Sequence, residues 1–180
     1  AAETRATFLA RAGDVLNSSL EYEQTLDAVA HLAVPSIADL CVVFLLEPGG
    51  MIRRVTSAHI DPVAEAELRA LQAALIDPAG EHPAAEVIRT RQALFNPPIP
   101  EAVLSAISAD PERQTLLRAL TPPSQMIVPL ISRTITLGAI SLGLGASDRR
   151  YTEADLTLGH KLAQRAAGAI DNARLYGEAQ

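Results

Sequence analysis

The sequence predicts an α+β fold, in which strands pair as antiparallel hairpins and helices pack against the resulting sheet. Strand-like segments rich in β-branched residues occur as two adjacent pairs, and a short turn joins the members of each pair, which is the pattern of a β-hairpin. Helical periodicity is confined to the two ends of the chain and to one long excursion between the hairpins. A doubly wound fold is therefore excluded, because its strands and helices would alternate.

The first half of the chain predicts two helices and a hairpin. Residues 3–16 carry apolar side chains at helical spacing, and a second helix ends just before Pro35. Residues 39–46 and 51–59 read as two strands, because β-branched and aromatic residues flank the turn sequence Glu-Pro-Gly-Gly.

The second half predicts an irregular segment, a second hairpin and a long helix. Residues 61–123 contain most of the prolines, short helices and a short extended piece near residues 93–95, and the first of these helices runs on to Leu75. Residues 125–132 and 135–144 form the second pair of strands. The last helix begins at a capping box, in which Thr152 is followed three residues later by an acid.

Composition excludes several classes of protein. The 180 residues suffice for one domain spanning 1–180. The net charge of −6, with a single lysine, disfavours a nucleic-acid partner. The only cysteine, Cys41, excludes an intrachain disulfide. No apolar run approaches the roughly 20 residues of a membrane helix, so we expect a cytoplasmic protein without membrane contact. The excess of arginine over the single lysine, together with abundant alanine, suggests a bacterial source.

Catalytic and metal-binding patterns are weak. Cys41 alternates with apolar neighbours on one strand face, which is typical of a buried structural thiol. The four histidines lie on different elements without metal-ligand spacing, so we expect neither a metal nor a cofactor. Ser141 sits in a faint nucleophile-elbow pattern, but the strand continues past it where an elbow needs a sharp turn into a helix. The sequence thus predicts no enzymatic activity.

Four segments in register carry a family resemblance. They are Ser124-Gln-Met-Ile-Val-Pro-Leu130, Leu137-Gly-Ala-Ile-Ser-Leu142, Arg150-Tyr-Thr-Glu-Ala-Asp-Leu156 and Ala169-Ile-Asp-Asn-Ala-Arg-Leu-Tyr176. Together they resemble GAF domains, and in particular the sensory GAF domains of bacterial histidine kinases and regulated serine phosphatases. The resemblance implies a central antiparallel sheet with the terminal helices on one face and the irregular segment on the other. Where members of this family bind a small molecule, the pocket lies under that irregular segment.

Specialised branches of the family are not supported. The chain from residue 47 onward has no cysteine for attaching a bilin chromophore. The Asn-Lys…Phe…Asp-Glu signature of cyclic-nucleotide-binding members is absent, and a lone cysteine cannot supply the thiols of a free methionine sulfoxide reductase.

Strand parity predicts which sheet face would bind a ligand. Side chains alternate between the two faces of a strand, and in residues 139–144 one face carries only small side chains. We expect this face to leave room for a mostly apolar guest, although the irregular segment packing down on it would leave no void. The candidate pocket residues are Val42, Phe44, Leu46, Gln125, Ile127, Ala139, Ser141 and Gly143.

The terminal helices are the predicted signalling elements. The last helix is apolar on two stripes, so one stripe can cover the sheet while the other needs a further partner. Residues 1–17 and 157–180 are therefore expected to flank the domain as dimerisation helices of a homodimer. The candidate dimer residues are Phe8, Val15, Leu158, Leu162, Ala166, Ala169 and Ala173.

Two functions follow from the resemblance. In the first, the domain is a signal-transduction sensor of the two-component type, which binds a small molecule and controls an attached kinase or phosphatase output domain through its last helix. In the second, the same fold is a ligand-free dimerisation and scaffolding module. A cavity with convergent polar groups favours the first, and a filled irregular segment favours the second.

Overall fold

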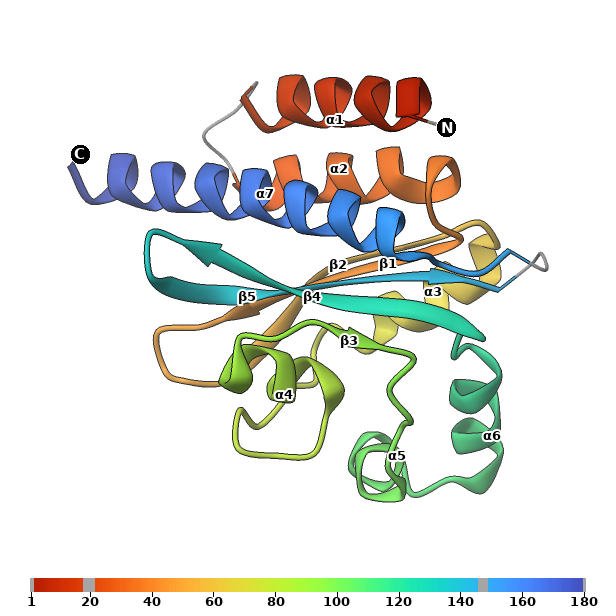
Figure 1. Ribbon diagram of the computed structural model, residues 1–180. Helices are drawn as coiled ribbons and strands as arrows, with labels where there is room; N and C mark the ends of the chain where they lie inside the picture. The colour runs from red at the N-terminus through yellow and green to blue at the C-terminus, as the bar shows by residue number, and fades with distance from the viewer. Residues whose placement is uncertain (1, 18–21, 146–148, 180) are drawn as a thin grey trace.

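The computed structural model describes residues 2–17, 22–145 and 149–179, arranged as layers of helices on both faces of one sheet (Figure 1). The elements, in chain order, are α1 (Ala2–Asn17), α2 (Tyr22–Ser36), β1 (Leu40–Leu46), β2 (Ile52–His59), α3 (Pro62–Ala70), α4 (Pro83–Thr90), β3 (Leu94–Phe95), α5 (Glu101–Ile107), α6 (Pro111–Ala119), β4 (Ser124–Ser132), β5 (Ile135–Leu144) and α7 (Glu153–Ala179).

The sheet is antiparallel throughout and has the strand order β2-β1-β5-β4-β3. Both predicted hairpins are present, as β1–β2 and β4–β5, and the α+β prediction is confirmed. β5 pairs with β1, so the two hairpins join in the centre of the sheet. The short extended piece near residues 93–95 becomes a fifth strand, because Leu94 pairs with Ile127 on β4.

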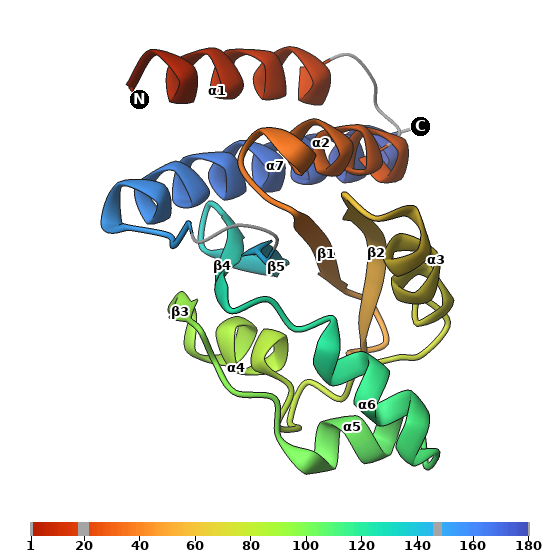
Figure 2. The same cartoon turned by 90° about the vertical axis from the view of Figure 1, so that its right-hand side faces the viewer.

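One face of the sheet is covered by long helices. α2 and α7 lie directly on the strands, and α1 lies over both of them on the side away from the sheet (Figures 1 and 2). Side chains of one strand parity point into this layer and are buried there. They include Cys41, Val43, Leu45, Met126, Val128, Leu130, Ile140 and Leu142.

The capping box of α7 is present as predicted. The Thr152 backbone N–H donates to Oδ2 of Asp155 at 2.8 Å, and the Asp155 N–H donates to the Thr152 hydroxyl at 3.5 Å. These reciprocal bonds satisfy backbone donors that the first helical turn leaves without partners.

Both stripes of α7 are covered by the chain itself. α1 packs on α7 and α2, and residues of both stripes of α7 belong to the buried apolar cluster. The periodicity of α7 alone did not predict this, because it does not show where α1 lies. Of the candidate dimer residues, Phe8, Leu158, Leu162, Ala166 and Ala173 are buried, while Val15 and Ala169 are half-buried.

The opposite face is covered by short pieces of the irregular segment. α4 packs under β4 and β5, α3 lies beside β2 at the sheet edge, and α5 and α6 lie farther out (Figure 2). Apolar side chains form two separate clusters here, one between α4 and the sheet and a small one holding Leu71, Leu104 and Leu117.

α3 is shorter than its apolar spacing suggests. The helix ends at Ala70, and the chain continues to Ala74 as turns in which the N–H groups of Leu71, Gln72 and Ala74 each donate to the carbonyl three residues back. Leu75, which helical spacing would have placed on the buried side, is exposed. The turns lead the chain to Ile76, whose backbone pairs with Ile52 at the edge of the sheet.

Candidate functional site

A cavity of about 130 Å³ lies between the sheet and the irregular segment. Its floor is formed by β1, β2, β4 and β5, and its roof by α5, α6 and the residues that follow them. Roof and walls are mostly apolar. They comprise Leu68, Leu71, His82, Pro83, Ile99, Val103, Leu104, Ile107, Leu117, Leu120, Thr121 and Pro122.

Strand register explains which side chains form the floor. Val42 on β1 is paired with Ser57 on one side and with Ser141 on the other, and Ser141 is paired with Ile127. These four side chains therefore form one row across the sheet. Neighbouring rows place Phe44 beside Arg54 and Leu40 in line with Gln125.

Five of the eight candidate pocket residues line this cavity, namely Val42, Phe44, Gln125, Ile127 and Ser141. The other three do not line it. Leu46 and Ala139 pack in the apolar cluster under α4, which covers that end of the face. At Gly143 an added Cβ would collide with the ring of Pro122, so the end of the irregular segment closes the space predicted there.

Gln125 anchors the irregular segment rather than standing free. Its backbone N–H donates to Oδ1 of Asn96 at 2.7 Å, and its side-chain amide donates to the Pro97 carbonyl at 3.5 Å. The side chain is buried, so these bonds fix the loop before α5 to β4.

The positively charged side chain of Arg54 lies at the corner of the floor opposite Gln125. Arg54 on β2 is 6% exposed, and its Nη1 reaches the carbonyls of Leu71 and Ala74 at 3.5 and 3.4 Å. Its guanidinium also lies 5.9 Å from the ring centre of Phe44. Burial lowers the pKa of Arg54 to about 10, which still leaves it protonated at neutral pH.

His82 lies beside Arg54, and its imidazole ring is uncharged at neutral pH. Burial, together with the positive charge of Arg54, lowers the pKa of His82 to about 3. Its Nδ1 accepts the backbone N–H of Ala84 at 3.0 Å and so caps the start of α4. Its ring also meets the Phe44 ring edge-on, with the centroids 5.5 Å apart.

Sequence reasoning missed Arg54, Ser57 and His82. Arg54 and Ser57 are three residues apart, and strict alternation would place them on opposite faces. The register between β1 and β2 shifts at this point, so one extra residue of β2, Val55, lets both face the cavity. The adjacent pair Arg53-Arg54 was the available signal, because alternation requires one of two neighbouring strand residues to point inward.

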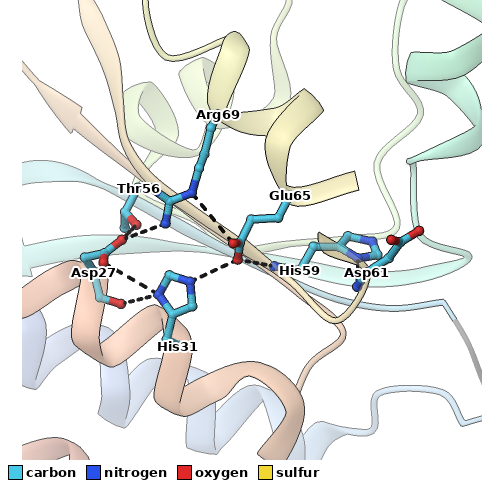
Figure 3. A network of polar contacts seen from close by, with 7 residues as sticks. All are labelled: Asp27, His31, Thr56, His59, Asp61, Glu65 and Arg69. Carbon is cyan, nitrogen blue, oxygen red and sulfur yellow. Dashed lines mark hydrogen bonds and ion pairs between the residues drawn. The ribbon is translucent and has the colours of Figure 1, made fainter. Parts of the chain in front are cut away.

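A second polar cluster lies outside the cavity and ties three elements together (Figure 3). The Asp27 carboxylate on α2 accepts bonds from the Thr56 hydroxyl on β2 and from Arg69 on α3, at 2.5 and 3.2 Å. His31 Nε2 lies 2.9 Å from the Glu65 carboxylate on α3. The network therefore links the helical layer to α3 around the edge of the sheet.

The polar cluster changes the pKa of His31. Burial lowers the pKa of His31, but the hydrogen bonds to the Asp27 carbonyl and to Glu65, together with the charges of both carboxylates, raise it above its usual value overall. The side chain is 41% exposed, so solvent screens these interactions.

Metal-binding and thiol chemistry have no geometric support in the part of the chain that the structure describes. No three His, Cys, Asp or Glu side chains there converge as metal ligands would. Cys41 is buried in the helical layer, and burial raises the pKa of its thiol to about 12, so the reactive thiolate is not formed at neutral pH. None of the described helices is long and apolar enough to cross a membrane.

Comparison with known proteins decides the family. The sequence matches the family model described as "GAF domain" over residues 19–171. The chain belongs to the GAF family. GAF domains are sensory and regulatory modules of signalling proteins. No curated protein sequence is significantly similar to the chain.

Solved GAF structures share the fold at low sequence identity. The GAF domain of a phosphoenolpyruvate-protein phosphotransferase from Coxiella burnetii superposes with a TM-score of 0.72 at 17% identity, covering 98% of both chains. Residues 122 to 287 of a methyl-accepting chemotaxis protein give 0.70 at 14% identity, over 92% of this chain and 98% of that one. The second GAF domain of DevS from Mycobacterium smegmatis gives 0.63 at 15%, over 89% and 100%. At these identities the similarity shows the fold alone.

Proposed function

We propose that this GAF domain is a sensor that binds a small organic molecule in the cavity under its irregular segment and controls an attached output domain through α7. The observation that carries the proposal is the cavity itself, because its floor is rigid sheet and its roof is made of short helices. Pockets for small molecules are concave and mostly apolar with a few convergent polar groups, as here.

A route from the cavity to the helical layer is available. Leu68 on α3 lines the cavity, while Glu65 and Arg69 on the same helix bond to α2 through His31 and Asp27. A shift of α3 on ligand binding would therefore pull on α2, which packs against α7. A cytoplasmic location and an output domain of the kinase or phosphatase type are part of this proposal.

The homodimer is also part of the proposal. Because most of the predicted contact residues are buried within the chain, a second copy would meet α1 and α7 where Val15 and Ala169 are only half-buried. Ala169 lines a hollow between these two helices. Sedimentation at micromolar concentration should show a dimer, and Ala169→Glu should weaken it by placing a charge in the contact. A monomer at that concentration contradicts this part of the proposal.

A ligand screen tests the sensor proposal. Small organic molecules, neutral and charged, are tested for an increase in melting temperature with the wild type and two variants. Ser141→Leu fills the cavity floor, while Ser105→Leu makes the same change at an exposed site on α5. Ligands should stabilise the wild type and Ser105→Leu, but not Ser141→Leu. Ligands that still stabilise Ser141→Leu, or a screen without any ligand, favour the scaffolding function instead.

A further inference from the structure

No carboxylate among the described residues balances the charge of Arg54. Among the described residues no carboxylate lies within 4 Å of its guanidinium, whose polar contacts are two carbonyls and the ring of His82. Asp77 and Glu81 line an adjoining hollow with Arg54, but neither forms an ion pair with it. A buried charge without a counter-charge is costly, so its persistence in a cavity wall points to an anion from outside the chain.

His82 adds a second donor at the same place. A backbone N–H can only donate, so the bond from Ala84 makes Nδ1 of His82 the acceptor. In the neutral ring the proton is then on Nε2, which therefore also donates. Nε2 lies 3.4 Å from Nη2 of Arg54, so two donors face one another without an acceptor between them. An oxygen with a negative charge would accept from both.

Ser57 completes the corner. Ser57 is among the residues that line the cavity. Its side chain is fully buried, at 0% exposure, and its hydroxyl has no hydrogen-bond partner among the described residues. A buried hydroxyl that makes no hydrogen bond is unusual in a folded protein. The extra residue in β2 turns it toward the same face as Arg54.

The remaining space defines the body of the ligand. Val42, Ile127 and Leu104 border the cavity with apolar surface, and about 130 Å³ is close to the roughly 150 Å³ of an engineered cavity that binds benzene. Arg54 is the only Lys or Arg among the cavity residues, so one negative charge is balanced and two are not. A doubly charged phosphate monoester would keep a buried excess charge, which favours a singly charged carboxylate.

We infer that the cavity binds a small monocarboxylate, whose carboxylate is held by Arg54, His82 and Ser57 and whose compact apolar body lies on Val42 and Ile127. This inference rests on the proposed sensor function and names the class of molecule that is sensed. Arg54 is suited to the task because its planar guanidinium can donate two parallel bonds to one carboxylate.

Calorimetric titration at pH 7 with matched probes tests the inference. Benzoate and isovalerate are the carboxylates, and benzamide and isovaleramide are their uncharged counterparts of nearly equal shape. Each carboxylate should bind at least about tenfold more tightly than its amide, since hydrogen bonds to a charged group are the stronger ones. Ser57→Ala and His82→Asn should each weaken carboxylate binding, about tenfold, and asparagine can still cap α4.

Arginine variants provide the matched control. Arg54→Met should abolish the preference for carboxylates. Arg53→Met removes the neighbouring arginine, which pairs with Glu47 and Glu23 away from the cavity, and should leave the preference intact. Arg54→Lys keeps the positive charge, so it tests the assignment even if Arg54→Met fails to fold. It should retain a weaker preference for carboxylates.

Two outcomes separate this inference from the sensor proposal. If amides bind the wild type as tightly as carboxylates, or Arg54→Met and Arg54→Lys keep the full preference, the carboxylate assignment is wrong while the cavity remains a binding site. The same holds if only neutral molecules bind in the cavity. If neither the probes nor any molecule of the broader screen binds there, the sensor proposal falls as well.

Discussion

The two faces of the sheet are covered in different ways. On one face, α2 and α7 are 15 and 27 residues long, and with α1 they bury a single continuous apolar cluster. On the other face, the covering helices have only seven to nine residues and lie between prolines, and the apolar side chains fall into two clusters. Long helices can follow the sheet and fill the space, whereas short helices leave gaps between them. The cavity is the gap that remains.

Two glycines of β5 should show the largest contrast, which is between the sheet and the irregular segment. A Cβ at Gly138 would collide with the backbone carbonyl of Phe44, whereas at Gly143 it would meet the ring of Pro122. The strand backbone cannot yield, so Gly138→Ala should cost about 3 kcal/mol or more of unfolding free energy. Gly143→Ala should cost about 1 kcal/mol, because the irregular segment can shift.

Urea unfolding of both variants measures this difference. Gly168→Ala on α7 is a control, because an added Cβ there meets no atom within 4 Å. Equal losses for Gly138→Ala and Gly143→Ala would mean that the irregular segment is as rigid as the sheet.

Matched leucine truncations should show the next largest effect. Leu162, at 0% exposure, lies in the continuous cluster, while Leu104, at 2%, borders the cavity. Leu162→Ala should cost about 4 kcal/mol, near the top of the usual range, because the packed layer cannot collapse around the deleted atoms. Leu104→Ala should cost about 2 kcal/mol, since α5 can settle inward. Chemical denaturation compares them, and a larger loss for Leu104→Ala would refute the ranking.

Two neighbouring arginines should have opposite effects on stability. Without ligand, Arg54→Met should raise the unfolding free energy by about 1 kcal/mol, because it removes a buried charge without a carboxylate partner. Arg53→Met should lower it by about 0.5 kcal/mol, since it breaks ion pairs at a partly exposed site. Denaturant titration in ligand-free buffer measures the sign of the change in unfolding free energy for both variants. A marked loss for Arg54→Met would mean that its bonds to the turn after α3 outweigh the cost of its burial.

Two histidines should give opposite responses to pH. The pKa of His82 is lowered from 6.5 to about 3 in the folded state, so stability from its neutral form is present above pH 6.5 and is lost as the pH falls toward 3. The pKa of His31 is raised, so its contribution is present below pH 6.5 and is lost as the pH rises through the folded value.

Thermal unfolding between pH 8 and 4 tests this pair. His82→Asn should reduce the loss of stability in acid relative to wild type, and His31→Gln should increase it slightly. If the two variants shift the acid limb in the same direction, one of the two environments is wrongly described.

The sequence predicted the scaffold better than the site. β-branched runs and turn residues located both hairpins, and the Thr152 capping box placed the start of α7, because these signals are local. The path of α1 over α7 depends on packing between distant segments, and no local pattern encodes it. The burial of Phe8 in the helical layer was not predicted for that reason.

The alternation of side chains along the strands predicted which rows form the cavity floor, but it did not predict where the floor ends. Val42, Ser141 and Ile127 follow from alternation, while the coverage of Ala139 by α4 depends on where an irregular segment settles. The register shift at Val55 reverses the alternation of side chains along β2. One extra residue therefore decided whether Arg54 and Ser57 could act together, and alternation cannot reveal such an insertion.

A crystal structure of the protein with benzoate tests the central claim most directly, namely that the loosely covered face is the ligand-binding face. We predict benzoate on the row formed by Ser57, Val42, Ser141 and Ile127, with a carboxylate oxygen within hydrogen-bond distance of Arg54 and unchanged packing between α7 and the sheet. The account would be contradicted by benzoate bound between the helices of the other face, or by a cavity closed by its own side chains while benzoate binds elsewhere.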